Sequence, residues 1–430
     1  MLTYSQSIGL LFELERLGMK FGLEGISRLM KELKNPHKKF RSVHIAGTNG
    51  KGSTASMVAA ILTAAGYRTG LYTSPHLLNF EERMRIDGRP IPRKAVVDLA
   101  TRLSRSIKKY HPTFFEATTA IAFAYFAEEE VDIAIVETGL GGRLDSTNVL
   151  RPLASVITNV GLEHTELLGN TLEKIAFEKA GIVKEGVPCI TGIRNSRILS
   201  VVKSACKEKH APLTLGTTYK TRIWESTLKG TLLDITLGDA SYKRLWISLP
   251  GLYQLGNLGP VLATVQTLQQ HSKFIVNEDA IRTGLSRVQE LSGLSGRLTA
   301  IHEAPLIIAD VAHNADATRS LVETWKRLKM QKPVVVFGVV RDKDYSSMVH
   351  EIARVAEQAV TVAARTPRSR PASDLAAAFE REKCKTVAAL SVEEGMRIAI
   401  RLAGRGGTIL VTGSHFVVGE AMAALGRKRA

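Results

Sequence analysis

The sequence predicts a protein of the α/β class with two domains, each built on a mostly parallel sheet covered by helices. Short apolar stretches rich in β-branched residues alternate with helical periodicity from residue 43 to residue 180, which is typical of such a sheet. A glycine- and serine-rich stretch at 291–297 follows, and a second alternation of strands and helices begins after it. At 430 residues the chain is also longer than one hydrophobic core usually supports.

We therefore expect a first domain over 1–292, a linker over 293–297 and a smaller second domain over 298–430. Residues 217–248 differ from the rest of the first domain, because short β runs there alternate with glycine and charged turns. This pattern indicates a small antiparallel excursion. Residues 5–34 carry apolar side chains at helical spacing and predict helices that serve packing.

The composition excludes several classes of protein. Hydrophobic residues make up 44% and charged residues 23%, as in globular proteins. No stretch approaches a membrane span and the N-terminus has no signal-peptide pattern, so we expect a cytoplasmic protein without a membrane partner. The three cysteines lie far apart and match no metal or disulfide spacing. We expect a monomer.

The net charge of +17 raises the possibility of a nucleic-acid partner. However, the basic excess is spread along the chain, and the aromatic residues, only 6% of the total, form no stacking series among the basic ones. We therefore expect no nucleic acid, and interpret the charge as a basic surface that attracts small anionic substrates.

The stretch at 43–54 (VHIAGTNGKGST) is the strongest candidate for a binding site. An apolar strand at 43–46 leads into a turn with three glycines and a lysine, and a helix is predicted at 55–65. Glycines let backbone N–H groups point at a phosphate, and the helix N-terminus adds positive charge. Lys51 precedes a glycine, unlike the lysine of the general P-loop. A nucleotide site is favoured over a turn without a ligand; its predicted members are Gly47, Thr48, Asn49, Gly50, Lys51, Gly52 and Ser53.

Polar residues end the neighbouring predicted strands. Ser74 follows strand 68–73, Glu137 follows strand 131–136 and His164 follows strand 154–159. Because the carboxyl ends of parallel strands meet at one edge of a sheet, these side chains can lie beside the glycine loop. A carboxylate there suits the Mg²⁺ of a bound nucleotide. The alternatives are helix or turn caps for Ser74 and Glu137 and ordinary hydrogen bonding for His164.

The loop GTNGKGS resembles the ATP loop of the Mur ligase family, and most closely that of its folylpolyglutamate and dihydrofolate synthases. The run at 137–148 (ETGLGGRLDSTN) resembles the family signature E-x-G-x-G-G-[RD]-x-D-[AS]-T-N, and the resemblance covers essentially the whole chain. It implies a P-loop ATPase-like first domain and a Rossmann-like second domain.

The resemblance also implies roles for particular residues. Lys51 binds ATP, Asn257, Arg297 and Asp310 contact it, and His313 lies beside the amino-acid substrate. Two Mg²⁺ sites are implied, one at Ser74 and Glu137 and one at His164 with a carbamylated Lys179. The residues implied at the pteroate substrate are Thr113, Phe114, Phe115, Glu116, Leu144, Asp145 and Ser146. Taken alone, the two phenylalanines favour core packing, and Lys179 favours a helix C-terminus.

Three positions depart from the family pattern. Gly256 replaces a glutamate beside Asn257, with Gly259-Pro260 interrupting the helix start. In the second domain, Asp-Gly-Ala-His-Asn-Pro is here DVAHNA at 310–315, and Gly-Ser-Leu-Tyr is GSHF at 413–416. Both changes fall where glutamate is expected to bind.

The function implied is ATP-dependent addition of L-glutamate to dihydropteroate, to reduced folates or to both, through an acyl phosphate. One alternative is another Mur-type amino-acid ligase with a UDP-muramoyl substrate, and a second is an ATP-dependent nucleic-acid-binding protein. Phe114, Phe115 and the Leu144–Ser146 segment favour the folate substrate over the first alternative, and no motif supports the second.

Overall fold

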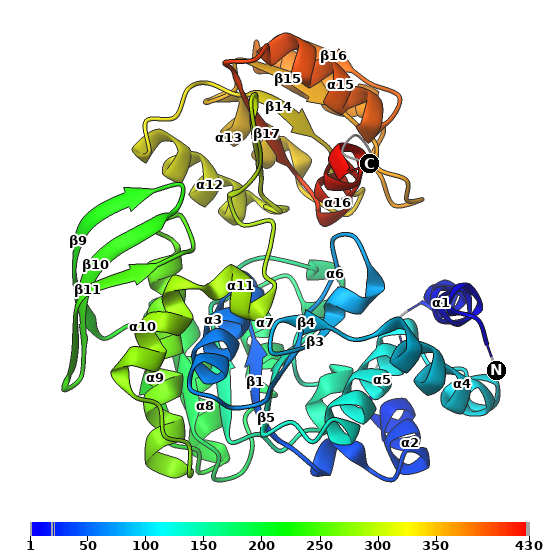
Figure 1. Ribbon diagram of the computed structural model, residues 1–430, viewed down its shortest axis with the longest axis vertical. Coiled ribbons are helices and arrows are strands. Elements are labelled where there is room, and N and C mark those ends of the chain that lie inside the picture. Colours follow the sequence, from blue (N-terminus) through cyan, green and yellow to red (C-terminus); the bar gives the residue numbers. More distant parts are fainter. Residues whose placement is uncertain (1, 19, 21, 427–430) are drawn as a thin grey trace.

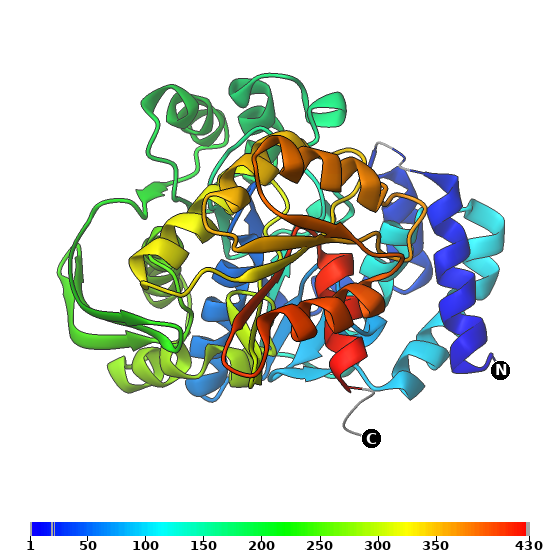
Figure 2. The same ribbon diagram turned by 90° about the horizontal axis from the view of Figure 1, so that it is seen from above.

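The computed structural model describes residues 2–18, 20 and 22–426. Figure 1 shows two α/β units one above the other along the longest axis, and Figure 2 shows the second unit from above, lying over the first. The predicted fold class is confirmed. No helix of the described residues is long and apolar enough to cross a membrane.

The first unit is built on an eight-stranded sheet with the order β4-β3-β2-β5-β1-β6-β7-β8. Strands β2, β5, β1, β6, β7 and β8 run parallel, and β3 and β4 form an antiparallel hairpin at one edge. The bounds are β1 (Arg41–Ala46), β2 (Thr69–Tyr72), β3 (Met84–Ile86), β4 (Arg89–Pro90), β5 (Ile133–Glu137), β6 (Ala154–Ile157), β7 (Cys189–Thr191) and β8 (Leu213–Leu215).

Helices cover both faces of this sheet, because each face presents β-branched and aliphatic side chains. One face packs on α3 (Lys51–Ala64), α9 (Gln254–His271), α10 (Glu278–Ser286) and α11 (Val288–Ser292). The other packs on α1 (Tyr4–Glu13), α2 (Glu24–Glu32), α4 (Arg93–Tyr110) and α5 (Phe114–Glu128). The β6–β8 end holds α6 (Thr165–Leu168), α7 (Leu172–Ala180) and α8 (Ser196–Glu208); short 3-10 helices are η1 (Leu14–Leu17), η2 (Pro36–Lys38), η3 (Phe80–Arg83) and η4 (Ser146–Val149).

Helix α3 begins at Lys51, four residues before the predicted start. Gly50 adopts the left-handed conformation (φ 80°), which turns the chain directly into the helix. As a result Gly52 and Ser53 lie in the first helical turn, where backbone N–H groups have no intrahelical acceptor. Helix α9 differs from its prediction too, since it continues through Pro260. Gly259 is needed there because a Cβ would lie 1.9 Å from the Gly216 carbonyl oxygen.

The antiparallel excursion forms its own three-stranded sheet of β9 (Tyr219–Thr227), β10 (Gly230–Leu237) and β11 (Ala240–Ile247). Its buried side chains, among them Leu233 and Ile235, join the hydrophobic core shared with α3, α9 and α10. The excursion therefore packs on the helical layer, and its strands are not paired with the strands of the main sheet.

The second unit contains a six-stranded sheet with the order β12-β13-β17-β14-β15-β16, parallel except for β12. The strands are β12 (Thr299–Glu303), β13 (Leu306–Ala309), β14 (Val334–Phe337), β15 (Gln358–Thr361), β16 (Thr386–Ala388) and β17 (Thr408–Thr412). One face packs on α12 (Ala315–Arg327), α13 (Tyr345–Ala353) and α14 (Ala372–Arg381), and the other on α15 (Val392–Ala403) and α16 (His415–Gly426). The predicted domain bounds, including the linker, stay a prediction.

Candidate active site

The glycine loop between β1 and α3 is held open by the segment that follows β6. The Thr48 N–H donates to the Asn159 carbonyl at 3.0 Å, and the Asn49 N–H donates to Asn159 Oδ1 at 2.8 Å. Gly47 has to be a glycine, because a Cβ there would lie 1.8 Å from Thr158 Oγ1. The loop is thus a rigid cradle with its carbonyls engaged and the N–H groups of the α3 N-terminus available to an anion.

Strand order explains why distant segments meet at this loop. Strands β2, β5, β1 and β6 are neighbours in the sheet and all parallel, so their carboxyl ends lie along one edge. Ser74, Glu137, Gly47 and Asn159 follow or end these four strands. The predicted grouping of Ser74 and Glu137 beside the loop is what the topology produces.

Two lysines converge on one carbonyl of the loop. Lys51 Nζ donates to the Gly47 and Thr48 carbonyls at 3.0 and 3.1 Å, and Lys179 Nζ donates to the Gly47 carbonyl at 2.8 Å. Lys179 is only 2% exposed, and burial together with the charge of Lys51 lowers the pKa of Lys179 to about 7. The surroundings of Lys179 thus favour the uncharged amine more than water does.

Glu137 is a buried carboxylate with little hydrogen bonding. Burial raises its pKa, and the charges of Lys51 and Arg297 and the Ser74 N–H, 3.3 Å away, oppose the rise. A Cβ on Gly52 would lie 3.5 Å from both Glu137 Oε2 and Arg297 Nη2. The helix start therefore lies against the Glu137 carboxylate and the linker arginine at once.

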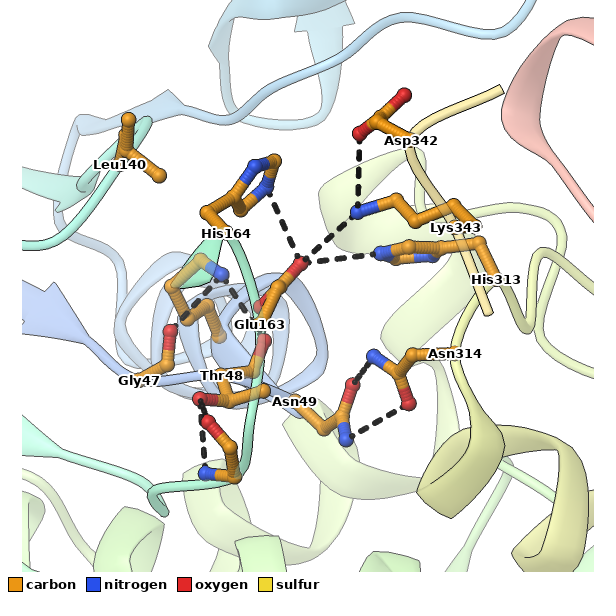
Figure 3. A network of polar contacts seen from close by, with 12 residues as sticks. Gly47, Thr48, Asn49, Leu140, Glu163, His164, His313, Asn314, Asp342 and Lys343 are labelled. Carbon is orange, nitrogen blue, oxygen red and sulfur yellow. Dashed lines mark hydrogen bonds and ion pairs between the residues drawn. The ribbon is translucent and has the colours of Figure 1, made fainter. Parts of the chain in front are cut away.

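A second polar cluster joins the two units around Glu163 (Figure 3). Glu163 Oε1 lies 3.4 Å from His164 Nε2, 3.4 Å from His313 Nε2 and 3.8 Å from Lys343 Nζ. Burial alone raises the pKa of Glu163, but the hydrogen bonds of His164 and His313 and the charge of Lys51 outweigh it and hold the pKa well below its ordinary value. These contacts favour the ionised form of the carboxylate, which lies at a contact between the domains.

The second unit presents its own strand ends to this junction. Asp310, His313 and Asn314 follow β13, Ser414 follows β17 and Lys343 follows β14, and these three strands are neighbours in the sheet. Asn314 pairs with Asn49 of the glycine loop. The sheet edges that hold the C-terminal ends of the parallel strands in the two units therefore face one another.

Other predicted nucleotide contacts are placed around the same loop. Asn257 is buried, and a Cβ on Gly50 would lie 2.1 Å from its Oδ1, so the side chain packs directly on the loop. Asp310 is buried and accepts from the Leu298 and Ala312 N–H groups, each at 2.9 Å, so it also orders the start of the second unit. Burial raises the pKa of Asp310, opposed chiefly by Arg297.

The four residues at 113–116, predicted to contact substrate, begin α5 with mixed roles. Thr113 and Glu116 form a reciprocal cap, in which the Thr113 N–H donates to Glu116 Oε2 at 2.7 Å. Phe114 stacks on Phe12 with ring centroids 5.3 Å apart. Phe115 lies against Gly139, where a Cβ would be 2.4 Å from its ring. Phe115 therefore lies directly beside the loop that follows β5.

The Leu144–Ser146 segment lies after the same strand. Asp145 is buried, accepts from the Leu140 N–H at 2.8 Å and the Thr147 N–H at 3.0 Å, and also accepts from the Thr147 hydroxyl. Leu144 is half-buried and Ser146 is buried. Asp145 therefore shapes this loop in addition to any contact it makes with a ligand.

No group of three or more His, Cys, Asp and Glu side chains that could hold a metal ion exists within residues 2–18, 20 and 22–426. Ser74 and Glu137 are adjacent, whereas His164 pairs with Glu163. The two predicted metal sites thus stay predictions.

Sequence reasoning missed three residues of the junction, namely Glu163, Asn314 and Lys343. Each directly follows or closely trails a predicted strand, at 154–159, 306–309 and 333–339. The strand-end rule applied to every strand would have found them. His415, one of the departures from the family pattern, lies with its ring centroid 5.3 Å from that of His313, and burial lowers its pKa.

The fold and the loop define a two-domain P-loop protein with its site between the domains. The Mur ligase middle domain matches residues 45–265, and the Mur ligase glutamate ligase domain matches residues 296–415. The chain belongs to the Mur ligase family.

Relatives and solved structures agree with this family. The dihydrofolate synthase/folylpolyglutamate synthase of Bacillus subtilis is 36% identical over 374 residues, 85% of this chain and 86% of that protein. The Escherichia coli enzyme is 32% identical over 90% of this chain and 86% of its own length. A structure of E. coli FolC in complex with DHPP and ADP superposes with a TM-score of 0.87 at 29% identity, covering both chains fully. The predicted ATP-dependent ligase of the folylpolyglutamate and dihydrofolate synthase type is thereby confirmed.

Proposed function

We propose that this protein uses ATP to join the amino group of L-glutamate to a carboxylate of dihydropteroate or of a reduced folate. One observation carries the proposal: the C-terminal strand ends of both sheets meet at the nucleotide loop. The contacts there are Asn49 with Asn314 and Glu163 with His313. The reaction needs such a junction because three groups have to be held together in one place. These are the γ-phosphate of ATP on the loop, the acceptor carboxylate and the incoming amine.

The reaction proceeds in two steps. The substrate carboxylate attacks the γ-phosphorus of ATP, which gives an acyl phosphate and ADP. The glutamate amine then attacks the acyl carbon, a C–N bond forms, the C–O bond to the phosphate breaks and inorganic phosphate leaves. Lys51 and the N-terminus of α3 hold the phosphates, and Arg297, Asp310 and Asn257 are proposed to contact the nucleotide.

Ser74 and Glu137 would hold one Mg²⁺, and their oxygens fit that ion. Mg²⁺ keeps several waters and takes only one or two protein carboxylates besides the phosphates, so two protein ligands are sufficient. Glu137 also has unused acceptor capacity, since the hydrogen bond found for its carboxylate within the described residues is a long one, from the Ser74 N–H at 3.3 Å. The ion supplies neutralisation of phosphate charge when bound.

His164 and a carbamylated Lys179 would hold the second Mg²⁺. The nitrogen of an uncharged lysine attacks CO₂ and then loses a proton, which leaves an anionic carbamate oxygen. The pKa of Lys179 near 7 supports this chemistry, because the uncharged amine is abundant at neutral pH. Phe115 and the Leu144–Ser146 segment are proposed to line the pterin side, with His313 beside glutamate.

The test is phosphate release by purified protein with ATP and L-glutamate, and with either dihydropteroate or a reduced folate as acceptor. We expect release with at least one pterin and none without glutamate. A UDP-muramoyl acceptor forms the second arm, and binding to single- and double-stranded DNA forms the third. Turnover restricted to the UDP-muramoyl acceptor would overturn the folate assignment, as would DNA-stimulated ATP hydrolysis without ligation.

A further inference from the structure

Two guanidinium groups line one cavity between the domains. The cavity has a volume of about 200 Å³. Arg297 enters it from the linker, and Arg85 enters from β3. Among the described residues, the arginine ion pairs include neither of them. The cavity therefore holds two positive charges without a paired carboxylate.

Arg85 is held in place by its surroundings. Its neighbours Met84 and Ile86 are buried in the core on the other face of the hairpin, so Arg85 points to the linker side. A Cβ on Gly293 would lie 2.6 Å from Arg85 Nε, so the guanidinium rests directly on the linker backbone. Arg85 Nε is buried without a hydrogen-bond partner, and burial lowers the pKa of Arg85.

One of the two acids that line the cavity, Glu82, is already engaged. Glu82 accepts the N–H groups of Leu77, Leu78 and Asn79 at 2.9 to 3.1 Å, which orders the loop after β2. Glu137 also lines the cavity, beside Gly52. The charge of Glu82 opposes the lowering of the Arg85 pKa by burial, but neither acid forms an ion pair with Arg85 among the described residues. A buried cation without an ion-pair partner is stabilised by an anionic ligand.

The cavity also adjoins the place where a terminal phosphate would lie. Gly52, in the first turn of α3, forms part of the wall, and Arg297 Nη2 would be 3.5 Å from a Cβ at that position. A phosphate released at the N-terminus of α3 would therefore enter a space that both Arg297 and Arg85 line. The planar fork of arginine matches phosphate oxygens in two parallel hydrogen bonds.

We propose that Arg85, together with Arg297, binds the inorganic phosphate that the ligation step releases. This inference rests on the proposed function for the origin of the phosphate. The phosphate leaves the acyl carbon with the electron pair of the broken C–O bond, and Arg85 receives its oxygens on the linker side of the cavity.

Direct binding of radiolabelled inorganic phosphate to the ligand-free protein tests the site. The variants are Arg85→Gln, Arg85→Lys and Arg89→Gln; Arg89 lies on β4 of the same hairpin but is exposed, which makes it the matched control. We expect the Kd for phosphate to rise about tenfold or more in R85Q, because a charge-assisted hydrogen bond is lost. R85K should weaken binding less, and R89Q should leave it unchanged.

Equal Kd values for wild type and R85Q would overturn the inference, as would wild type without saturable phosphate binding. Melting curves report whether each variant is folded. If R85Q is unfolded, the Kd for phosphate of R85K is compared with that of R89Q, and equal values would refute the site. L-glutamate that displaces phosphate only when Arg85 is present would instead assign the site to a carboxylate and also refute the inference.

Ligation assays keep this site separate from the proposed function. Arg85-dependent phosphate binding in a protein that fails to ligate any pterin would remove the proposed function and leave the phosphate site standing. Ligation by a protein whose phosphate binding does not depend on Arg85 would leave the proposed function standing and remove the phosphate site.

Discussion

The side-chain amides of Asn49 and Asn314 face one another across the boundary between the two domains. Asn314 Nδ2 donates to Asn49 Oδ1 at 2.9 Å, and Asn49 Nδ2 donates in return to Asn314 Oδ1 at 3.4 Å. Asn49 belongs to the glycine loop, and Asn314 is the N-cap of α12, where its Oδ1 accepts the Ala317 N–H. One amide pair thus connects the nucleotide loop to a helix of the second domain.

Asn314→Asp should loosen this connection without removing the helix cap. Aspartate caps helices as well as asparagine does, but it lacks the donor for Asn49 Oδ1. A net hydrogen bond contributes about 1 kcal/mol, so we expect roughly a fivefold shift towards separated domains. Small-angle scattering of the ligand-free protein measures it, and ATP with the pterin substrate should reduce the radius again. An unchanged radius in N314D and upon ligand saturation would contradict both expectations.

Lys51→Ala should abolish ligation and leave the fold intact. Lys51 is half-buried, and within the described residues the hydrogen bonds of its Nζ go to two loop carbonyls, so the hydrophobic core does not depend on it. Phosphate release gives the activity, and a melting curve within a few degrees of wild type gives the fold. Lys220→Ala, at an exposed position of β9, is the control and should turn over normally. Wild-type turnover by K51A would remove the ATP assignment.

The lowered pKa of Lys179 predicts that the stability of the protein rises with pH. Its folded pKa of about 7 is below its ordinary value of 10.5, so between these two values the unfolded chain holds a proton that the folded one has lost. The free energy of unfolding then increases with pH, by up to about 1.4 kcal/mol per pH unit. Urea unfolding at pH 6.5 and 9 in CO₂-free buffer measures the slope. Lys179→Met should lack this part of the rise; identical slopes for the two proteins would refute the shifted pKa.

The proposed carbamate makes a separate prediction for the same residue. Lys179→Arg keeps a cation but cannot form a carbamate, so we expect a severe loss of turnover. Removing CO₂ from the wild-type enzyme should lower activity, and bicarbonate should restore it, whereas K179R should respond to neither treatment. Full activity of K179R without CO₂ dependence would leave Lys179 as an ordinary cation.

Glu163→Gln should weaken the contact between the domains most above pH 4.5. The folded pKa of Glu163 is held below its ordinary value of 4.5, so the ionised carboxylate stabilises the folded state above that pH, and this contribution is lost as the pH falls. We expect the difference in unfolding free energy between wild type and E163Q to be about 1–3 kcal/mol at pH 7 and to shrink at acid pH. A difference that stays constant from pH 7 to pH 3.5 would show that the charge is not responsible.

Much of the site was readable before the fold was known. The glycine loop at 47–53, Ser74 and Glu137 each follow or end an apolar strand, and parallel strands bring their carboxyl ends together whatever the details of packing. Local sequence therefore determined which residues lie at the edge of the first sheet. It placed the start of α3 four residues late, because the left-handed turn at Gly50 depends on the loop conformation.

Only the tertiary structure decided which residues of the two edges meet. Glu163 and His313 are 150 positions apart, and neither periodicity nor composition encodes their contact. Tertiary packing likewise engaged Thr113 and Glu116 in a helix cap and left Arg85 against Gly293 without a partner. The physical reason is that strand ends are set by local chain geometry, whereas contacts across the junction depend on how two separately packed sheets dock, which is a property of the whole chain.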